Sequence, residues 1–187
     1  MTAAVRQQIL ISGVGGQGVL FVTRLLAEAA ILRGLPVFTS ETHGMAQRGG
    51  TVVSHLKVGD FHSPLIRVGQ ADGLLVLKAE NLAQHAFFLK PGGWVVVNAA
   101  GQANFDAPGT VSALDADRLV QEGGNPKSLN LVVLGFALAV AERMKKNPDR
   151  LFCSLADIEA AVASGSKNRP DQAVAFLKAI RSGYDAV

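Results

Sequence analysis

Cysteine is nearly absent from this chain, whose 187 residues include one, Cys153. A single thiol excludes an internal disulfide framework and a structural zinc site built on several cysteines. It also excludes a self-contained iron–sulfur cluster, which takes about four thiolates. Any iron–sulfur redox chemistry linked to this chain must therefore lie on another chain.

Charge is scarce as well. Charged residues make up 18% of the chain and the hydrophobic set 49%, whereas an average soluble domain has roughly 25% charged residues. This composition excludes a disordered chain and leaves apolar surface for a permanent partner. We therefore expect an exposed apolar patch through which the chain self-associates or binds that partner.

Long hydrophobic runs are also missing. The longest, Leu131–Ala141, is shorter than the roughly 18 to 20 residues that span a bilayer, and the N-terminus lacks the apolar core of a signal peptide. The Lys and Arg residues are scattered and aromatic residues make up 6%, which gives no support for nucleic-acid binding. We expect a cytoplasmic protein with no membrane or nucleic-acid partner.

The N-terminal part alternates strand-like and helix-like segments. An apolar run at 9–12 ends in glycines, and residues 17–33 then place apolar side chains at helical spacing. Gly34 ends this helix and Leu35–Ser40 starts a second strand. A right-handed crossover makes the two strands parallel, so we predict a β-α-β unit.

A hairpin is predicted next. After a polar loop at 41–50, the segments 51–58 and 61–66 flank a Gly-Asp dipeptide suited to a two-residue turn. The second segment contains a proline, which cannot donate to a strand ladder and therefore belongs at an edge. In this hairpin His55 and His62 lie on opposite arms, but the four histidines show no metal-ligand spacing.

The remaining segments complete one domain over residues 1–187. Ser154 is the expected N-cap of a helix with Asp157 in the capping-box position, and Asn130 is expected to cap another, with Ser128 as the competing residue. Alternating strands and helices predict an α/β fold: a three-layer, Rossmann-like, mostly parallel sheet with an edge hairpin and a helical C-terminal part. We predict a strand at 73–78, a helix at 80–89, a turn at 91–93, a strand ending at Asn98, and helices at 114–122, 129–146, 154–163 and 171–182.

A glycine motif follows the first strand and opens the first helix, where G-x-G-x-x-G binds a phosphate. Glycines allow close approach of the backbone, and the free amides at a helix N-terminus favour an anion. The alternative is that these glycines only permit tight packing of the helix on the strand. The expected cofactor-binding residues of the loop are Gly13, Gly15, Gly16, Gln17 and Gly18.

Three further residues join this candidate site. Glu41 follows the second strand, where a dinucleotide fold carries the acid that holds a ribose. Arg48, in the polar loop, could bind a phosphate through two N–H groups. Asn98 ends a strand at the same sheet edge as Gly13 and either binds a ligand or stops the strand. We favour partner contact for His43 and Met45, and we predict no catalytic residue and no metal site.

Long strings of the sequence carry a family resemblance. GVGGQGVLFVTRLLAEAA, TSETHGMAQRGGTVVSHLKVG, SPLI and QADGLLVL occur in order, and NLVVLG follows at 130–135. The chain resembles the gamma subunit or gamma domain of the 2-oxoacid:ferredoxin oxidoreductases, and among these the small, beta subunit of indolepyruvate ferredoxin oxidoreductase. It departs from the pattern at Phe176, which stands where such subunits usually have Asn.

The resemblance implies a function in a complex. Such enzymes decarboxylate a 2-oxoacid on thiamine diphosphate, pass electrons through iron–sulfur clusters to ferredoxin, and transfer the acyl group to coenzyme A. This chain lacks the cluster thiols, and Gly59-Asp60-Phe61 does not match a thiamine-binding motif. We therefore expect thiamine diphosphate, magnesium and [4Fe–4S] clusters in a larger partner subunit, with ferredoxin reached through that subunit.

The isolated chain is then inactive and serves as the small subunit of an oxidoreductase for indolepyruvate or another aryl pyruvate. Coenzyme A, which carries a pyrophosphate, is a candidate ligand of the glycine loop, and its contact with this chain stays open at this point. One alternative is a free-standing NAD(P)- or flavin-dependent Rossmann oxidoreductase, supported by the glycine loop and Glu41. The other is a pure interaction module with an empty loop.

Overall fold

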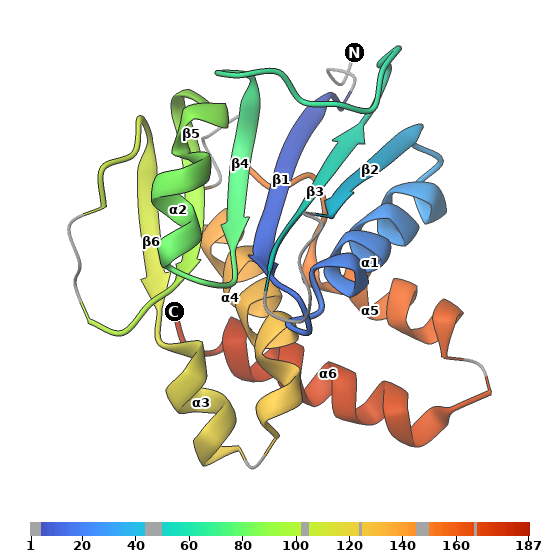
Figure 1. Cartoon of the computed structure of the whole chain (residues 1–187). Helices are drawn as coiled ribbons and strands as arrows, with labels where there is room; N and C mark the ends of the chain where they lie inside the picture. Colours follow the sequence, from blue (N-terminus) through green and yellow to red (C-terminus); the bar gives the residue numbers. More distant parts are fainter. Residues whose placement is uncertain (1–4, 44–49, 102–104, 124, 145–149, 167) are drawn as a thin grey trace.

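A computed structural model describes residues 5–43, 50–101, 105–123, 125–144, 150–166 and 168–187. They form a sheet with helices on both faces (Figure 1). The strands are β1 (Gln7–Val14), β2 (Val37–His43), β3 (Thr51–Val58), β4 (Ala71–Val76), β5 (Leu89–Asn98) and β6 (Thr110–Leu114). The helices are α1 (Val19–Leu32), α2 (Glu80–His85), η1 (Ala86–Phe88, 3-10), α3 (Ala116–Glu122), η2 (Pro126–Ser128, 3-10), α4 (Leu129–Arg143), α5 (Leu155–Gly165) and α6 (Pro170–Tyr184).

The strand order is β2-β3-β1-β4-β5-β6. β1, β4, β5 and β6 pair in parallel, and β3 is antiparallel to both of its neighbours, β1 and β2. β2 therefore runs in the same direction as β1, as predicted, but β3 lies between them. The α/β fold with a mostly parallel sheet is confirmed, while the β-α-β unit is split by an inserted strand.

The predicted hairpin across Gly59 is wrong. Residues 61–66 form no strand, and β3 pairs with β1 and β2 on its two sides, which leaves no free edge for a further arm. Gly59 has φ 108°, and a Cβ there would lie 2.1 Å from the Val5 carbonyl oxygen. The glycine thus permits the close approach of the N-terminal segment. His55 is buried and His62 is exposed, and without the hairpin the two do not lie on opposite arms of one.

Other boundaries shift. The helix expected at 80–89 ends earlier, and β5 already begins at Leu89, so the turn expected at 91–93 lies inside that strand. The register between β4 and β5 shifts there, between Ala71 and Gly73. β6 was not predicted. The four C-terminal helices are confirmed, and the capping box of Ser154 and Asp157 is present at the start of α5.

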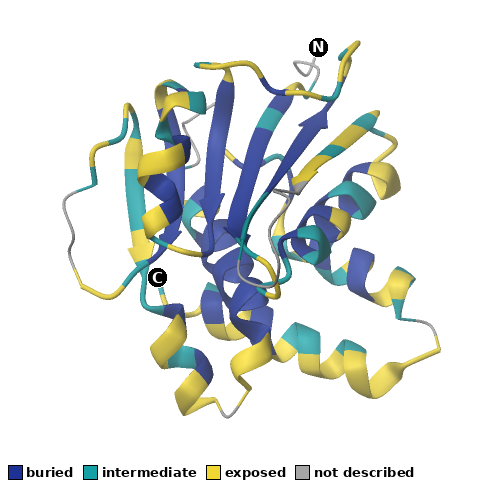
Figure 2. Cartoon of the chain, in the orientation of Figure 1, coloured by how far each residue is buried: buried dark blue, intermediate teal, exposed yellow. Residues whose placement is uncertain are grey.

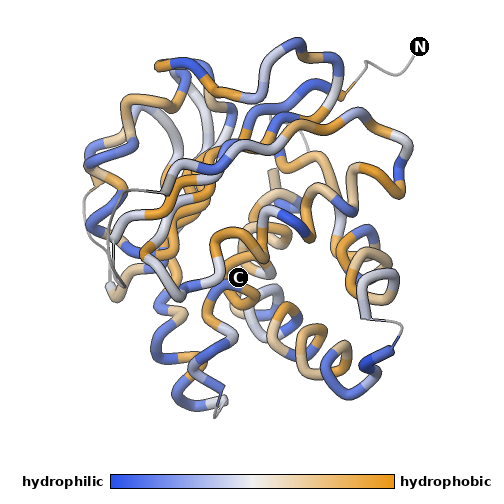
Figure 3. Tube along the Cα trace, turned by 45° about the vertical axis from the view of Figure 1, so that its right-hand side comes forward, coloured by the Kyte–Doolittle hydropathy of each residue, from blue (hydrophilic) through white to orange (hydrophobic). Residues whose placement is uncertain are grey.

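The sheet separates two hydrophobic clusters of unequal size. We call the side covered by α1, α3, α4, α5 and α6 the thick face, and the side covered by α2, η1 and residues 59–70 the thin face. Successive side chains of β1 contribute to the two clusters in turn: Ile9 and Ile11 point to the thick face and Leu10 points to the thin face. The central strands and α4 are buried (Figure 2), and hydrophobic residues run along the strands and the helices beneath them (Figure 3). None of the described helices is long and apolar enough to cross a membrane.

Candidate functional site

The glycine motif lies at the carboxyl end of β1, where the chain turns into α1 (Figure 1). Gly16 and Gly18 have φ values of 97° and 78°, in the left-handed region that favours glycine. A Cβ on Gly13 would lie 2.8 Å from the Val19 side chain and 2.9 Å from Gln17 Oε1. Glycine is therefore required at three positions of the motif by the turn and by its packing.

Side-chain and backbone hydrogen bonds hold this turn. Gln17 Oε1 accepts from the Val14 amide at 2.9 Å, and its Nε2 donates to the Leu77 carbonyl at 3.2 Å, across to the end of β4. The Gly15 amide donates to the Gly50 carbonyl at 2.9 Å, which ties the loop to the start of β3. The predicted residue Gln17 is thus a support of the loop, and the Gly15 amide is already engaged.

Asn130 supports the loop from the thick face. Its Nδ2 donates to the Gly18 carbonyl at 3.2 Å, and a Cβ on Gly18 would lie 2.4 Å from the same nitrogen. The expected capping role is wrong, because Ser128 is the N-cap of α4 and no side chain caps that helix. The sequence signal was a lone Asn at the start of a long apolar run, which marks a buried polar contact.

The turn leaves several backbone amides available to an anion. Among the described residues, no hydrogen bond is made by the amides of Gly16, Gly18 and Val19, whereas those of Phe21 and Val22 already bond to the Gly18 carbonyl. These groups lie at the N-terminus of α1, where aligned peptide dipoles give a partial positive charge. An anionic group of a ligand fits such a position.

The other predicted site residues are placed differently. Asn98 is buried, and its amide donates to Leu77 O at 3.3 Å and to Asp117 Oδ2 at 2.8 Å, while Oδ1 accepts from the Ala116 amide at 2.9 Å. These bonds tie the end of β5 to β4 and to the start of α3. A ligand-binding role for Asn98 stays a prediction, but its polar atoms are engaged within the chain.

Glu41 lies in β2, not in a loop, and is exposed. β3 separates β2 from β1, so Glu41 does not lie on the strand next to the glycine loop, where the ribose-binding acid of a dinucleotide fold is expected. Arg48 and Met45 lie outside the described residues, and so does the side chain of His43. The structure thus brings the glycine loop and Asn98 together at the carboxyl ends of the parallel strands.

Lys78 was missed by the sequence reasoning. It lies two residues after the end of β4, next to the Leu77 carbonyl that binds Gln17 and Asn98, and its ammonium lies 3.3 Å from Glu80 Oε1. Hydrogen bonding to its own backbone amide and to Lys78 lowers the pKa of Glu80. The sequence signal is a lysine directly after a buried apolar run. Lys78 therefore brings a partly exposed positive charge to the carboxyl edge of the sheet.

A buried polar cluster supports the loop from the thin face. Asn81 Nδ2 donates to Gly13 O at 2.9 Å and to Ser12 Oγ at 3.1 Å, and Ser12 Oγ lies 3.0 Å from His85 Nδ1. Burial lowers the pKa of His85. Ser12 Oγ and the His85 ring thus share a hydrogen bond inside the protein. α2 is thereby locked onto the end of β1.

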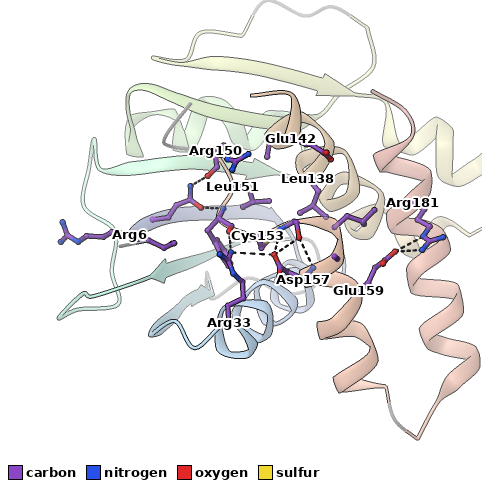
Figure 4. A pocket seen from close by; sticks show the side chains of 17 residues that line it. Arg6, Arg33, Leu138, Glu142, Arg150, Leu151, Cys153, Asp157, Glu159 and Arg181 are labelled. Carbon is purple, nitrogen blue, oxygen red and sulfur yellow. Dashed lines mark hydrogen bonds and ion pairs between the residues drawn. The ribbon is translucent and has the colours of Figure 1, made fainter. Parts of the chain in front are cut away.

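A cavity of about 1020 Å³ lies at the opposite, amino end of β1, away from the glycine loop (Figure 4). The side-chain amide of Gln7 holds one wall, bonding Arg150 O at 2.8 Å and the Phe152 amide at 2.9 Å. Cys153 lies in this wall, and burial raises the pKa of its thiol. None of the predicted cofactor-binding residues that the structure describes lines this cavity.

Comparisons with known proteins follow the chain almost from end to end. A model of the family described as pyruvate ferredoxin/flavodoxin oxidoreductase matches residues 8–186. The indolepyruvate oxidoreductase subunit IorB of Archaeoglobus fulgidus is 35% identical over 70% of this chain and 75% of its own length. The subunit of the same name from Thermococcus kodakarensis is 34% identical over 68% of this chain and 74% of its own length.

Solved structures share the fold. The gamma subunit of a keto/oxoacid ferredoxin oxidoreductase from Geobacter sulfurreducens has a TM-score of 0.73 and 26% identity, over 96% of both chains. The 2-oxoglutarate:ferredoxin oxidoreductase from Magnetococcus marinus has a TM-score of 0.75 and 21% identity. The match covers 97% of this chain but 31% of that longer chain.

Proposed function

This chain belongs to the pyruvate ferredoxin/flavodoxin oxidoreductase family, and from that membership we propose that it is the small subunit of a 2-oxoacid:ferredoxin oxidoreductase acting on indolepyruvate or another aryl pyruvate. The support is that relatives of comparable length carry the name of an indolepyruvate oxidoreductase subunit. Subunits of ketoisovalerate oxidoreductase and 2-oxoglutarate synthase are also similar, so the fold serves several 2-oxoacids.

The residues of this chain do not fit an iron–sulfur cluster. Its one cysteine is buried, and in the described part no group of three or more His, Cys, Asp or Glu could hold a metal ion. The N-terminal segment packs closely against Gly59, and we therefore do not assign a thiamine site to the Gly59-Asp60 pair. The proposal therefore assigns thiamine diphosphate, magnesium, the clusters and the contact with ferredoxin to a larger partner subunit.

The glycine loop is assigned to coenzyme A. The observation that carries this assignment is a turn made rigid by Gln17 and Asn130, with three amides at the N-terminus of α1 left without a partner among the described residues. A pyrophosphate fits such amides, and Lys78 adds a positive charge nearby. The Magnetococcus marinus enzyme was solved with 2-oxoglutarate, coenzyme A and succinyl-CoA bound, which makes coenzyme A the first ligand to test here.

The dinucleotide alternative has weaker support. It needs an acid on the strand beside β1, and the insertion of β3 moves Glu41 one strand further away. NAD would then lack its usual ribose contact.

Reconstitution tests the subunit assignment. The purified chain alone is expected to be colourless and to reduce no viologen dye with indolepyruvate and coenzyme A, whereas adding the larger subunit restores the reduction. Turnover by the isolated small chain, after removal of all traces of the larger one, contradicts the assignment.

Thermal protection tests the loop. Coenzyme A or its desulfo analogue at about 100 times Kd is expected to stabilise the chain, alone or with its partner, by about 2.7 kcal/mol, and NAD much less. Gly16→Ala should abolish this protection, because a Cβ there meets no atom of the chain within 4 Å and projects into the space left for the ligand.

Gly34→Ala is the matched control, since Gly34 also has a positive φ and open space around its missing Cβ. Both variants place a Cβ on a residue with positive φ, which costs about 1 kcal/mol or more. Only Gly16→Ala should lose the ligand. Equal protection of both variants by coenzyme A, or better protection of the wild type by NAD, contradicts the assignment.

A further inference from the structure

Lys57 is almost completely buried, although its side chain carries a charge. It lies two residues after His55 in β3, so both side chains point to the thin face, and it is only 5% exposed. Its ammonium lies 5.0 Å from the centre of the Phe61 ring. Within the described part of the chain, this ammonium makes no hydrogen bond and no ion pair. Lysines are rarely buried without a partner, so Lys57 lacks the negative charge that would compensate its own.

Two arginines lie near Lys57. Arg6 precedes β1, and its guanidinium carbon lies 4.4 Å from the centre of the same Phe61 ring. Arg67 lies in the segment 59–70 and is exposed. Burial lowers the pKa of Lys57, and repulsion from Arg67 and Arg6 lowers it further. We call Lys57, Arg6 and Arg67 the cation cluster.

The acids closest to the cation cluster along the chain and across the sheet do not neutralise it. Asp60, in the segment 59–70, meets Arg6 through its backbone oxygen at 3.3 Å. Asp72, on β4, pairs with Lys90 at 2.6 Å. Among the described residues, none of the three cations forms an ion pair with a carboxylate. The cluster therefore attracts a negatively charged group from outside the described chain.

Exposed apolar side chains lie on the same face. In the part of the chain that the structure describes, seven large apolar side chains are exposed, and four of them belong to the thin face: Phe38, Leu65, Val68 and Phe87. Phe38 of β2 stands opposite Lys57 in the strand register, so their side chains are neighbours on one side of the sheet. Leu65 and Val68 lie within two residues of Arg67.

This combination is typical of a protein-binding surface. Exposed apolar groups in number mark an interaction site, and aromatic side chains and arginine are enriched where proteins meet. Arg6 also lines the large cavity at the amino end of β1 (Figure 4), whereas Lys57 and Arg67 do not. The cation cluster is therefore better suited to a side chain of a partner protein than to an enclosed small molecule.

We propose that the thin face docks against the larger subunit and that a carboxylate of that subunit binds between Lys57, Arg6 and Arg67. This inference rests on the proposed function, which provides the partner. The carboxylate supplies the missing negative charge, and the apolar side chains around it are removed from water. Lys57 pairs with Gln8 near the amino end of β1, whereas the glycine loop follows the carboxyl end. Docking at the cation cluster therefore leaves the loop open to its own ligand.

Removing the charge of Lys57 tests the proposal. Lys57→Met keeps the length of the side chain, and the isolated chain should become more stable towards urea because an uncompensated buried charge is lost. The same variant should bind the larger subunit about tenfold or more weakly in isothermal titration calorimetry at low salt. Lys178→Met on α6 is the matched control, because Lys178 is exposed on the thick face. It should change neither the stability nor the affinity.

Arg67 provides a second variant that should keep the fold, because its side chain is exposed. Arg67→Glu should weaken binding of the larger subunit more than Arg67→Gln does, since it places a carboxylate opposite the proposed one. Both variants should also make the affinity less dependent on salt. Far-UV circular dichroism checks that each variant is folded.

The outcomes separate this inference from the proposed function. A wild-type chain that does not bind the larger subunit contradicts both. A complex that restores viologen reduction, and that Lys57→Met and Arg67→Glu form as tightly as the wild type, agrees with the proposed function but overturns the inference, because the docking surface then lies elsewhere. So does a Lys57→Met chain that loses stability and keeps its affinity, because Lys57 then serves only the fold.

Discussion

The two faces of the sheet are built on different principles. The thick face has five helices over an almost wholly aliphatic cluster, whereas the thin face has one short helix, one 3-10 turn and the segment 59–70 over a smaller cluster. Yet the buried polar side chains that can carry charge, apart from the thiol of Cys153, lie on the thin face: His55, Lys57, Asp72 and His85.

The two histidines hold parts of the thin layer in place, and Asp72 ties neighbouring strands together. His55 Nδ1 accepts from the Ile66 amide at 3.2 Å and so fastens the segment 59–70 to β3, while His85 fastens α2 to β1. Asp72 accepts from the Gln8 amide at 2.6 Å and pairs with Lys90 at 2.6 Å. The thin layer buries too little apolar area to be stabilised by that alone, and specific hydrogen bonds hold it in place. Its stability is therefore more sensitive to the loss of single polar groups than the stability of the thick face.

The largest expected loss of stability comes from a substitution on the thick face. At the crossing of α4 and α6, a Cβ on Gly183 would lie 1.8 Å from the Val132 carbonyl oxygen, so Gly183→Ala forces the two backbones apart. We expect a loss of about 3 kcal/mol or more in the free energy of unfolding, measured by urea denaturation. Gly165→Ala at the end of α5, where a Cβ meets nothing, is the control and should change stability by less than about 1 kcal/mol. Equal effects of the two changes would show that the crossing is not close-packed.

The next largest loss of stability is expected from a substitution on the thin face. Asn81→Ala removes two donors and leaves Gly13 O and Ser12 Oγ buried without them. The expected cost is about 2 kcal/mol, because unsatisfied buried polar groups pay a desolvation penalty. Hydrogen exchange should show the loss first in α2 and the end of β1. Glu80→Gln, on the same helix but exposed, should leave the free energy of unfolding almost unchanged. A uniform loss of protection over α4 and α6 contradicts the independence of the two faces.

The pH dependence of the free energy of unfolding tests the contribution of the two buried histidines of the thin face. Burial lowers the pKa of His55, with Lys57 and His85 adding repulsion, and burial lowers the pKa of His85. The unfolded chain therefore binds more protons than the folded one below the ordinary value of 6.5. This contribution to stability is complete above that pH and is lost as the pH falls, at no more than about 1.4 kcal/mol per pH unit for each histidine.

Urea denaturation between pH 8 and about pH 5 measures this slope. His55→Gln and His85→Gln should each reduce it and the double variant should nearly remove it, with the thick face unaffected. A stability that is flat or rises on acidification, or a slope unchanged in the double variant, contradicts the assignment.

The smallest expected effect concerns an ion pair on the thick face. Arg181 donates to Glu159 Oε1 from two nitrogens, at 2.7 and 3.0 Å, but its side chain is 62% exposed. Solvent and salt weaken such pairs, so Arg181→Gln should cost about 0.5 kcal/mol or less. A double-mutant cycle with Glu159→Gln measures the coupling. A coupling energy above about 1 kcal/mol would show that this surface pair contributes as much as a buried hydrogen bond.

Several parts of the site were predictable because they depend on local chemistry. The turn between β1 and α1 needs glycines within a few residues of one another, and the sequence places them there. Asn130 and Asn81 were not assigned to this site, because each reaches it from a segment far away in the chain. A lone polar residue in an apolar run predicts a buried hydrogen bond, but it does not predict which residue is the partner.

The amino-acid sequence by itself determined the alternation of strands and helices, the glycine turn after the first strand, the C-terminal helices with the capping box at Ser154, and the absence of cluster thiols, because periodicity, capping and composition are local properties. Only the tertiary structure decided that β3 lies between β1 and β2, that Glu41 lies on an outer strand, and that His55, Lys57, Asp72 and His85 gather on one face. Strand order depends on which distant segments bury their apolar faces together. Residues 51–58, buried along most of their length, suited a central strand as well as a hairpin arm, and pairing on both sides settled the choice.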